Sequence, residues 1–272
     1  MERSTRGFWD QIALRWRFAE PITPCHEDIW WYEREAGQRV RGRARALLLG
    51  VTAGIASMQW PQSTVLTAVD WSTNMLKNVW PAGNTPASSA PACADWRELP
   101  IAGGCIDLVV GDGCYAALSK TADATLFNAE LGRVARPGGI LLMRCFCRPP
   151  ARLQAHELFE RLFSGSVASL DLFRFLLAMA LYEDAHTRVT RRAVWELWAR
   201  HVPNARALQD RMGWTDDDLA NMERIAAVDH TYYFPTLDEL IELWRPHFAL
   251  LSTDTPAYAW GELFPRVVLG AR

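Results

Sequence analysis

Short apolar runs alternate with amphipathic segments between residues 45 and 149 of the 272-residue chain. Such runs, of four to six residues without strict alternation, are typical of strands buried on both faces, as in a parallel sheet. The segment 82–94, rich in alanine, proline, serine and glycine, interrupts the series and is predicted to be a loop. The predicted strands are Ala46–Leu49, Val65–Val69, Ile106–Val110 and Ile140–Cys145.

Two helices are predicted between these strands. Ser72 or Thr73 caps a helix that ends before Pro81, because proline cannot continue a helix. A second helix covers residues 123–134 and is closed by the turn sequence Arg-Pro-Gly-Gly at 136–139. Strands and helices that alternate in this way predict βαβ units, and therefore an α/β fold with a parallel sheet.

After Pro149 the pattern changes. Apolar residues recur at helical spacing, as in Leu170, Phe173 and Leu177, which is typical of one buried helix face. Residues 150–235 are therefore predicted to form a helical insertion. The first pattern then returns, with a helix predicted over 238–245 and strands over 248–253 and 266–269.

Composition disfavours several classes of protein. The net charge is −2 and the pI is about 6.3, so the chain lacks the basic surface expected of a nucleic-acid-binding protein. Residues 1–16 contain no apolar core of a secretory signal. The most apolar stretch, 170–182, is interrupted by Asp171 and Arg174 and is too short to span a bilayer. The six cysteines show no Cys-x-x-Cys pair and no zinc-ligand spacing. We expect a soluble cytoplasmic protein with no nucleic-acid partner, no membrane partner and no metal.

Four motifs along the first half of the chain have the chemistry of a nucleoside site. Residues 47–54, Leu-Leu-Leu-Gly-Val-Thr-Ala-Gly, run from a strand into a glycine turn, where the backbone can approach a ligand closely. Asp70 ends the next strand about 20 residues after Gly50, where a carboxylate can bind both hydroxyls of a ribose. Residues 94–96, Ala-Asp-Trp, precede the third strand, and residues 131–142 lead into the fourth through Arg-Pro-Gly-Gly.

In this order and at this spacing, the motifs resemble those of the class I S-adenosyl-L-methionine (SAM) dependent methyltransferases. The resemblance covers about residues 45–145, and the two predicted C-terminal strands resemble the closing pair of that family. It implies a Rossmann-like α/β fold whose mostly parallel, seven-stranded sheet has an antiparallel last strand, with the helical insertion between strands five and six. It also implies SAM as the cofactor and S-adenosyl-L-homocysteine (SAH) as the product.

The resemblance further implies a division of the chain and a set of cofactor contacts. The expected parts are an N-terminal helical segment that covers the site (1–44), a SAM-binding core (45–149), a helical substrate cap (150–235) and a C-terminal helix with the last two strands (236–272). The implied cofactor residues are Gly50, Thr52 and Gly54 beside the methionine part of SAM, Asp70 at the ribose, Trp71 and Met75 near the adenine, Asp95 and Trp96 at the adenine edge, and Gly111 and Asp112 facing the ammonium group.

Two positions depart from the family pattern. Leu48 stands where the family has an acidic residue, and Thr52 replaces the second glycine. The missing acid removes a hydrogen bond to charge worth about 1.5–3 kcal/mol, for which Asp112 is expected to compensate. These departures leave open a degenerate fold that acts as a binding or regulatory subunit, or chemistry other than methyl transfer. A nicotinamide oxidoreductase is disfavoured, because its Gly-x-Gly-x-x-Gly motif would need glycine at Thr52 and Ile55.

The acceptor site carries no motif, but the helical insertion is expected to enclose a small molecule that is methylated on an oxygen or nitrogen atom. A base is needed only if the acceptor must first lose a proton, and His230 is the leading candidate because imidazole titrates near neutrality. His26 and Tyr233 are further candidates, and the protein is expected to be a monomer or a homodimer. Core packing is the alternative for the aromatic residues of the N-terminal segment, and a hydrophobic hinge is the alternative for Tyr232. The candidate substrate contacts are Trp9, Trp30, Tyr32, Tyr115, Arg144 and Tyr232.

Overall fold

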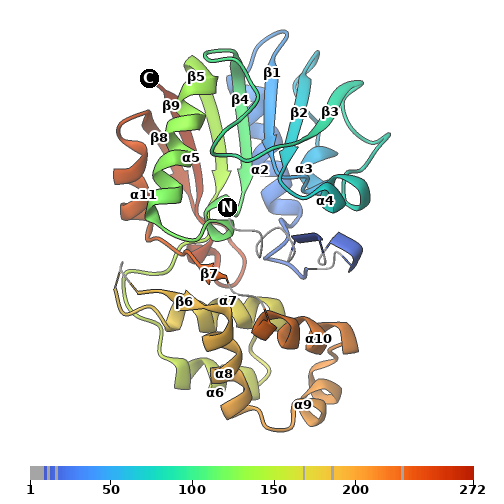
Figure 1. Ribbon diagram of the computed structural model, residues 1–272, viewed down its shortest axis with the longest axis vertical. Helices are drawn as coiled ribbons and strands as arrows, with labels where there is room; N and C mark the ends of the chain where they lie inside the picture. Colours follow the sequence, from blue (N-terminus) through green and yellow to red (C-terminus); the bar gives the residue numbers. More distant parts are fainter. Residues whose placement is uncertain (1–8, 11–12, 16–17, 168, 185–186, 228–229) are drawn as a thin grey trace.

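The structure is a computed structural model that describes residues 9–10, 13–15, 18–167, 169–184, 187–227 and 230–272. Within these residues, seven strands form one sheet in the order β3–β2–β1–β4–β5–β9–β8 (Figure 1). Their bounds are β1 Arg45–Leu49, β2 Val65–Asp70, β3 Ser88–Cys93, β4 Ile106–Asp112, β5 Ala135–Arg144, β8 Phe248–Asp254 and β9 Arg266–Ala271.

The sheet is parallel except at β9, which runs antiparallel to both of its neighbours, β5 and β8. This arrangement confirms the predicted Rossmann-like α/β fold with an antiparallel last strand. The strand order reverses between β1 and β4, and doubly wound sheets bind ligands at the carboxyl ends of the strands beside such a switch point.

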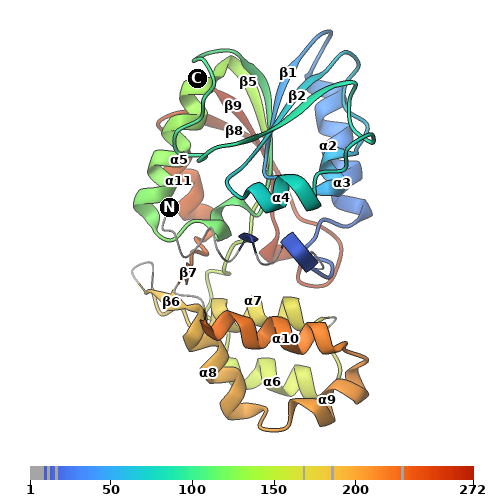
Figure 2. The ribbon, with the colours of Figure 1, turned by 45° about the vertical axis from the view of Figure 1, so that its right-hand side comes forward.

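Helices cover both faces of the sheet (Figure 2). Successive side chains of β1 point to opposite faces, so Leu47 and Leu49 pack toward α5 and α11, whereas Leu48 packs toward α2 and α3. Both faces are therefore apolar, which explains why the strands lack alternation. The covering helices are α2 His26–Arg39, α3 Ala53–Ala56 and α4 Thr73–Asn78 on one face, and α5 Thr121–Val134 and α11 Leu237–Trp244 on the other.

Two local predictions about strands were wrong. The segment predicted as a loop at 82–94 contains the edge strand β3, whose small side chains are mostly exposed. An edge strand needs hydrogen bonds on one side only, so Pro91 is tolerated there although it lacks an N–H. β5 begins at Ala135 and takes in the expected turn, because Arg-Pro-Gly-Gly forms an irregularity within the strand, where the register with β4 shifts between Ile106 and Leu108.

A group of helices follows β5 where the helical insertion was predicted, and it lies beyond the carboxyl ends of the sheet strands (Figure 1). It has a hydrophobic cluster that includes the buried Phe173, Leu177 and Trp198. No helix in the described part of the chain has the length and apolar character needed to cross a membrane. The elements of this group are α6 Ala155–Phe163, α7 Leu170–Ala180, α8 Arg191–His201, α9 Ala205–Met212, α10 Asp216–Arg224, the antiparallel pair β6 Val189–Thr190 and β7 Thr231–Tyr232, and the 3-10 helix Ile225–Ala227. Elsewhere in the chain, short 3-10 helices form at Ala13–Arg15, Cys114–Ala117 and Gly261–Leu263.

Candidate active site

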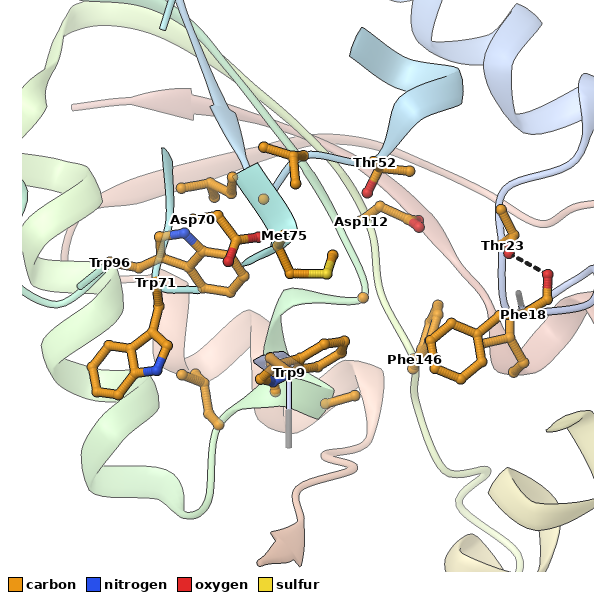
Figure 3. A pocket seen from close by; sticks show the side chains of 18 of the residues that line it. Trp9, Phe18, Thr23, Thr52, Asp70, Trp71, Met75, Trp96, Asp112 and Phe146 are labelled. Atoms are coloured by element: carbon orange, nitrogen blue, oxygen red, sulfur yellow. Dashed lines mark hydrogen bonds between the residues drawn. The ribbon is translucent and has the colours of Figure 1, made fainter. Parts of the chain in front are cut away.

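A cavity lies at the carboxyl ends of β1, β2 and β4, and side chains from α7, α8 and β7 line its far end. Its space, counted out to bulk solvent, is about 1160 Å³. Figure 3 shows Asp70, Met75 and Trp96 gathered at one end, and Phe18 and Phe146 at the other. The residues singled out from the sequence that lie in the wall are Gly50, Thr52, Asp70, Trp71, Met75, Asp95, Trp96 and Asp112 among the cofactor candidates, and Trp9 and Tyr232 among the substrate candidates.

Gly50 makes the turn after β1 with a φ of +88°, in the left-handed region that favours glycine. Its N–H donates to the Val69 carbonyl at 2.8 Å, which fixes the turn against the end of β2. A Cβ at this position would lie 3.8 Å from Asp70 Oδ2 and 3.7 Å from Trp96 Cζ2. The bare backbone therefore forms part of the wall between these two side chains.

Asp70 ends β2 and is held by the start of α4. Its Oδ1 accepts from the Ser72 N–H at 2.8 Å, and the Ser72 hydroxyl accepts from the Met75 N–H at 3.1 Å as the predicted helix cap. Burial raises the pKa of Asp70 to about 6, while the Ser72 hydrogen bond lowers it and the nearby Asp10 charge raises it further. The carboxylate is thus buried at an energetic cost that a ligand donating hydrogen bonds would relieve.

Two tryptophans flank Asp70 with different hydrogen bonding. Trp96 Nε1 donates to the Val69 carbonyl at 2.7 Å, so this indole is fixed to the sheet. Trp71 Nε1 is buried and has no acceptor among the described residues. Because a buried N–H without an acceptor is costly, Trp71 is a ready donor for a bound molecule.

Asp95 lies in the wall but already binds a cation. Arg97 holds it through Nη2–Oδ2 at 2.7 Å and Nε–Oδ1 at 3.0 Å, and also binds Asp123 of α5 at 2.7 Å. Burial raises the pKa of Asp95, and the Arg97 N–H lowers it. A carboxylate oxygen has two lone pairs, so a ligand amino group would share Asp95 with Arg97.

The two departures from the family motif differ in their effect. Leu48 is fully buried in the core on the α2 side, so this position contributes to packing and not to the cavity. Thr52 lies in the wall at the start of α3.

Asp112 is also in the wall, but Arg144 holds it through Nε–Oδ1 at 2.6 Å and Nη2–Oδ2 at 3.1 Å. Its compensation for Leu48 stays a prediction.

Arg144 was predicted as a substrate contact, and the structure corrects this. Its side chain has no exposed surface and lies outside the cavity wall. Besides Asp112, the guanidinium donates to Asp28 of α2 at 3.1 Å and to the carbonyls of Pro21 and Ile22 at 2.6 and 3.1 Å. With its donors bound to the protein, Arg144 ties the segment before α2 to the end of β5.

Three aromatic candidates are also outside the wall. Tyr32 is fully buried, and its hydroxyl donates to the Gly111 carbonyl at 2.7 Å and accepts a backbone N–H of β5 at 2.9 Å. Tyr115 is buried on the other face of the sheet, where its hydroxyl donates to Asn128 at 2.6 Å. Trp30 is 52% exposed on the surface of α2. The first two connect parts of the core, so the alternative of core packing holds for Tyr32.

Two glycines predicted beside the cofactor serve packing instead. A Cβ at Gly54 would lie 3.3 Å from the Ile29 side chain of α2, and one at Gly111 would lie 2.8 Å from Cys114 Sγ. Neither glycine is part of the cavity wall. Their small size allows α2 and the turn after β4 to approach the sheet.

The described wall contains none of the predicted bases. His230 is buried, with Nδ1 3.2 Å from Ser119 Oγ, and burial followed by the Arg191 charge lowers its pKa to about 3. A group with that pKa is a weak base at neutral pH. Tyr233 packs in the core on the α5 side, where burial raises its pKa, and His26 is exposed at the start of α2. The structure therefore does not support a base role for these three.

Sequence reasoning predicted Tyr232 but missed the other residues at the far end of the cavity. Its wall includes Phe18, Phe146, Arg174, Phe175 and Arg191, which come from distant parts of the chain. The sequence did contain one indication of this part of the wall. Arg174 interrupts the most apolar helix of the chain, and a charged residue in such a place is seldom buried without a partner. The phenylalanines gave no signal, because an apolar pattern does not distinguish a core from a cavity wall.

Comparison with protein families gives one match. Residues 47–143 match a family model described as a methyltransferase domain. The matched segment runs from β1 to β5 and contains Gly50, Asp70, Asp95 and Asp112. A comparison with curated proteins gives no match.

Solved structures share the fold at low sequence identity. A proposed zinc-dependent alcohol dehydrogenase from Rhodobacter sphaeroides has a TM-score of 0.67 at 13% identity, with 100% of both chains covered. The N-methyltransferase NodS from Bradyrhizobium japonicum WM9, in complex with SAH, has a TM-score of 0.55 at 9% identity, with 98% of both chains covered. The 1,6-didemethyltoxoflavin-N1-methyltransferase from Burkholderia thailandensis, with 1,6-didemethyltoxoflavin and SAH bound, has a TM-score of 0.55 at 14% identity, covering 99% of this chain and 87% of that one.

These likenesses concern the fold, whereas the family match concerns the sequence. In the residues that the structure describes, no group of three or more His, Cys, Asp or Glu side chains is arranged to bind a metal ion. The strand order, the antiparallel last strand and the matched segment agree with one another. Together they show a Rossmann-like fold in which residues 47–143 match a methyltransferase domain and which solved SAM-dependent methyltransferases share.

Proposed function

We propose that the protein transfers the methyl group of SAM to an oxygen or nitrogen atom of a small molecule, with SAH as the second product. One observation carries this proposal: a single cavity is walled at one end by Gly50 and Asp70 and at the other by Phe175 and Tyr232. A methyl donor and its acceptor would therefore lie end to end in one cavity, which is the arrangement that in-line transfer requires.

The residues at the strand ends fit the cofactor. Gly50 leaves its backbone open, and Asp70 lies beside it with Oδ1 bound to Ser72, so Oδ2 is available for a ribose hydroxyl. Trp71 Nε1 is a buried donor without an acceptor in the described chain. When bound, SAM supplies an electrophilic methyl group on a sulfonium. The protein then has to hold the acceptor in line with the bond that breaks.

Aromatic side chains in the wall opposite Asp70 suit this positioning role. Phe146 and Phe175 meet edge to face with ring centroids 5.6 Å apart, and both lie in the wall. Orientation of this kind supplies about 7–11 kcal/mol toward a bimolecular reaction. Since the predicted bases lie outside the wall, we favour an acceptor that is nucleophilic without help, such as an amine or an ionised hydroxyl.

The helical segment limits the size of the acceptor, because its side chains line the cavity end opposite the sheet. The pI of about 6.3 provides no basic face for a polymer of phosphates, so we expect no methylation of RNA or DNA. All six cysteines are free thiols, which is consistent with the expected cytoplasmic location. Robust methylation of bulk tRNA or rRNA would contradict the small-molecule proposal.

Titration calorimetry with SAM, SAH and NADH tests the cofactor part of the proposal. We expect micromolar binding of the two adenosyl ligands only, weakened by Asp70→Ala. Incubation with SAM labelled in the methyl group and pools of amines and phenols then tests the acceptor part. Label in a small organic product would support the proposal.

A second candidate is a degenerate methyltransferase fold that acts as a binding or regulatory subunit. The fully buried Leu48 and the Asp112–Arg144 pair favour it, since both remove a carboxylate that could bind the methionine ammonium group. Absence of adenosyl binding in the calorimetric titrations would favour this candidate and redirect the search to partner proteins.

A further inference from the structure

Two buried arginines line the cavity at the end opposite Asp70. Arg174 of α7 is 3% exposed and Arg191 at the start of α8 is 5% exposed, and both belong to the wall. Tyr232 of β7 is 3% exposed and lies in the same wall. Burying a guanidinium costs free energy unless it is paired, so the groups around it indicate which ligand it binds.

Arg174 is only partly satisfied by the protein. Its Nη2 contacts Asp171 Oδ1 at 3.2 Å, while Asp171 Oδ2 accepts from the Ala19 N–H at 3.2 Å. Arg174 Nε is buried without an acceptor in the described chain, and the Tyr232 hydroxyl is buried without any described partner. Two buried polar groups with unused hydrogen-bonding capacity therefore meet at one end of the cavity.

Both guanidiniums lie over aromatic rings. Arg174 Cζ lies 5.6 Å from the ring centroid of Phe18 and 5.4 Å from that of Phe175. Arg191 Cζ lies 5.2 Å from the Tyr232 ring centroid. These ring contacts supply no oxygen acceptor for the Arg174 Nε–H, and a guanidinium can bind a carboxylate or a phosphate in a forked geometry.

The charges around the far end of the cavity also favour an anionic ligand. Burial, and then repulsion from Arg174, lower the pKa of Arg191 to about 10, with Tyr232 acting in the opposite direction. The wall carboxylates Asp95 and Asp112 already bind Arg97 and Arg144. An anion that entered the cavity would thus meet positive charge at its far end.

We propose that the methyl acceptor is an anion, and that its carboxylate or phosphate group binds Arg174, Arg191 and the Tyr232 hydroxyl. Its apolar body then lies along Phe175 and Phe146. Phe146 lies beside the turn after β4, where a Cβ on Gly113 would come within 2.9 Å of its ring, so an apolar body along Phe146 would extend toward the strand ends. This inference rests on the proposed function, because it names the substrate class of the same site.

The test uses three probes with one ring and different end groups: phenylacetate, phenyl phosphate and the neutral phenylacetamide. Each is titrated calorimetrically into the full-length protein saturated with SAH. We expect at least one anion to bind in the millimolar range or tighter, and the amide to bind at least tenfold more weakly. Comparison of the two anions distinguishes a carboxylate site from a phosphate site.

Variants identify the residues responsible. Arg174→Gln should weaken binding of the preferred anion at least tenfold, and Tyr232→Phe should weaken it several-fold. Tyr232→Phe removes a hydroxyl with no described partner, so it should fold even if Arg174→Gln does not. Arg152→Gln is the matched control, since Arg152 is half exposed in the same helical segment, pairs with Glu183 at 3.6 Å and lies outside the wall.

The inference is overturned if the amide binds as tightly as both anions, if neither anion binds at millimolar concentration, or if Tyr232→Phe and a folded Arg174→Gln bind the anion as the wild type does. SAH affinity is measured on the same samples. Normal SAH binding with failed anion binding defeats this inference alone, whereas absent SAH binding defeats the proposed function.

Discussion

Arg144 and Asp112 form a buried two-point ion pair between neighbouring strand ends, with Nε–Oδ1 at 2.6 Å and Nη2–Oδ2 at 3.1 Å. They are direct register partners on β5 and β4, and neither side chain is more than 5% exposed. The same guanidinium reaches Asp28 of α2 at 3.1 Å. The pair therefore joins the sheet to α2 beside the cavity, where Asp112 is part of the wall and Arg144 is not.

Removing the cation of this pair should destabilise the fold strongly. Arg144→Met leaves the Asp112 and Asp28 carboxylates buried with a partner missing, and breaking a buried pair in this way costs about 3–5 kcal/mol. Urea unfolding at pH 7 measures the loss. Arg152→Gln removes a half-exposed arginine and should change the free energy of unfolding by less than about 0.5 kcal/mol. A loss below about 1 kcal/mol in Arg144→Met would show that the pair contributes little.

Asp70→Asn should stabilise the free protein while weakening cofactor binding. The rise of the Asp70 pKa from 3.8 to about 6 means that the ionised form is disfavoured in the folded state, by about 3 kcal/mol above pH 6. Below pH 3.8 the group is protonated whether folded or unfolded, so the cost vanishes there and develops as pH rises through this window. Asparagine can keep the hydrogen bond from the Ser72 N–H but carries no charge.

The measurement is urea unfolding of wild type and Asp70→Asn from pH 4 to pH 8, together with SAH affinity at pH 8. We expect the stability gain of the variant to grow with pH up to about pH 6 and then level off. SAH affinity should fall, since an amide accepts fewer hydroxyl hydrogen bonds than a carboxylate. A variant that is less stable than wild type at pH 8 would show that the carboxylate is not strained by burial.

The cofactor end of the cavity could be predicted because its residues are fixed by local geometry. Gly50 directly follows β1 and Asp70 ends β2, and these two strands are parallel neighbours. The carboxyl ends of neighbouring parallel strands must meet at one edge of the sheet. Once the apolar runs are recognised as strands, a glycine turn and an acid at those positions come together without further information. The same reasoning fails for β3, whose exposed side chains leave no apolar pattern.

Apart from Tyr232, the acceptor end could not be predicted, because it depends on tertiary placement. Phe146 and Arg174 meet the same cavity only after the helical segment is folded beyond the sheet. Tyr32 and Arg144 were assigned to the substrate although they lie outside the wall. An aromatic residue or an arginine looks the same in the sequence whether it lines a pocket or belongs to a buried hydrogen-bond network. Burial and hydrogen-bond partners separate the two cases, and neither is readable from a single sequence.

Gly50→Ala should abolish cofactor binding and cost modest stability. Gly50 has a φ of +88°, where alanine is strained by about 1 kcal/mol or more, and its backbone forms part of the cavity wall. Gly42→Ala is the matched control, because Gly42 has a φ of +68° with nothing within 4 Å of an added Cβ. Both variants should lose similar stability in urea unfolding, and only Gly50→Ala should lose SAH binding in calorimetry. Equal SAH affinity in the two variants would remove Gly50 from the cofactor site.

Trp71→Phe and Trp96→Phe should separate ligand binding from folding. Trp96 Nε1 donates to the Val69 carbonyl at 2.7 Å, so Trp96→Phe should lower the free energy of unfolding by about 1 kcal/mol or more. Trp71 Nε1 has no acceptor in the described chain, so Trp71→Phe should cost no hydrogen bond in the free protein. If that N–H donates to the adenosyl group, Trp71→Phe should instead weaken SAH binding by up to about tenfold, the equivalent of one hydrogen bond. Unfolding and calorimetry on both variants decide the matter, and unchanged SAH affinity in Trp71→Phe would place this indole outside the cofactor contacts.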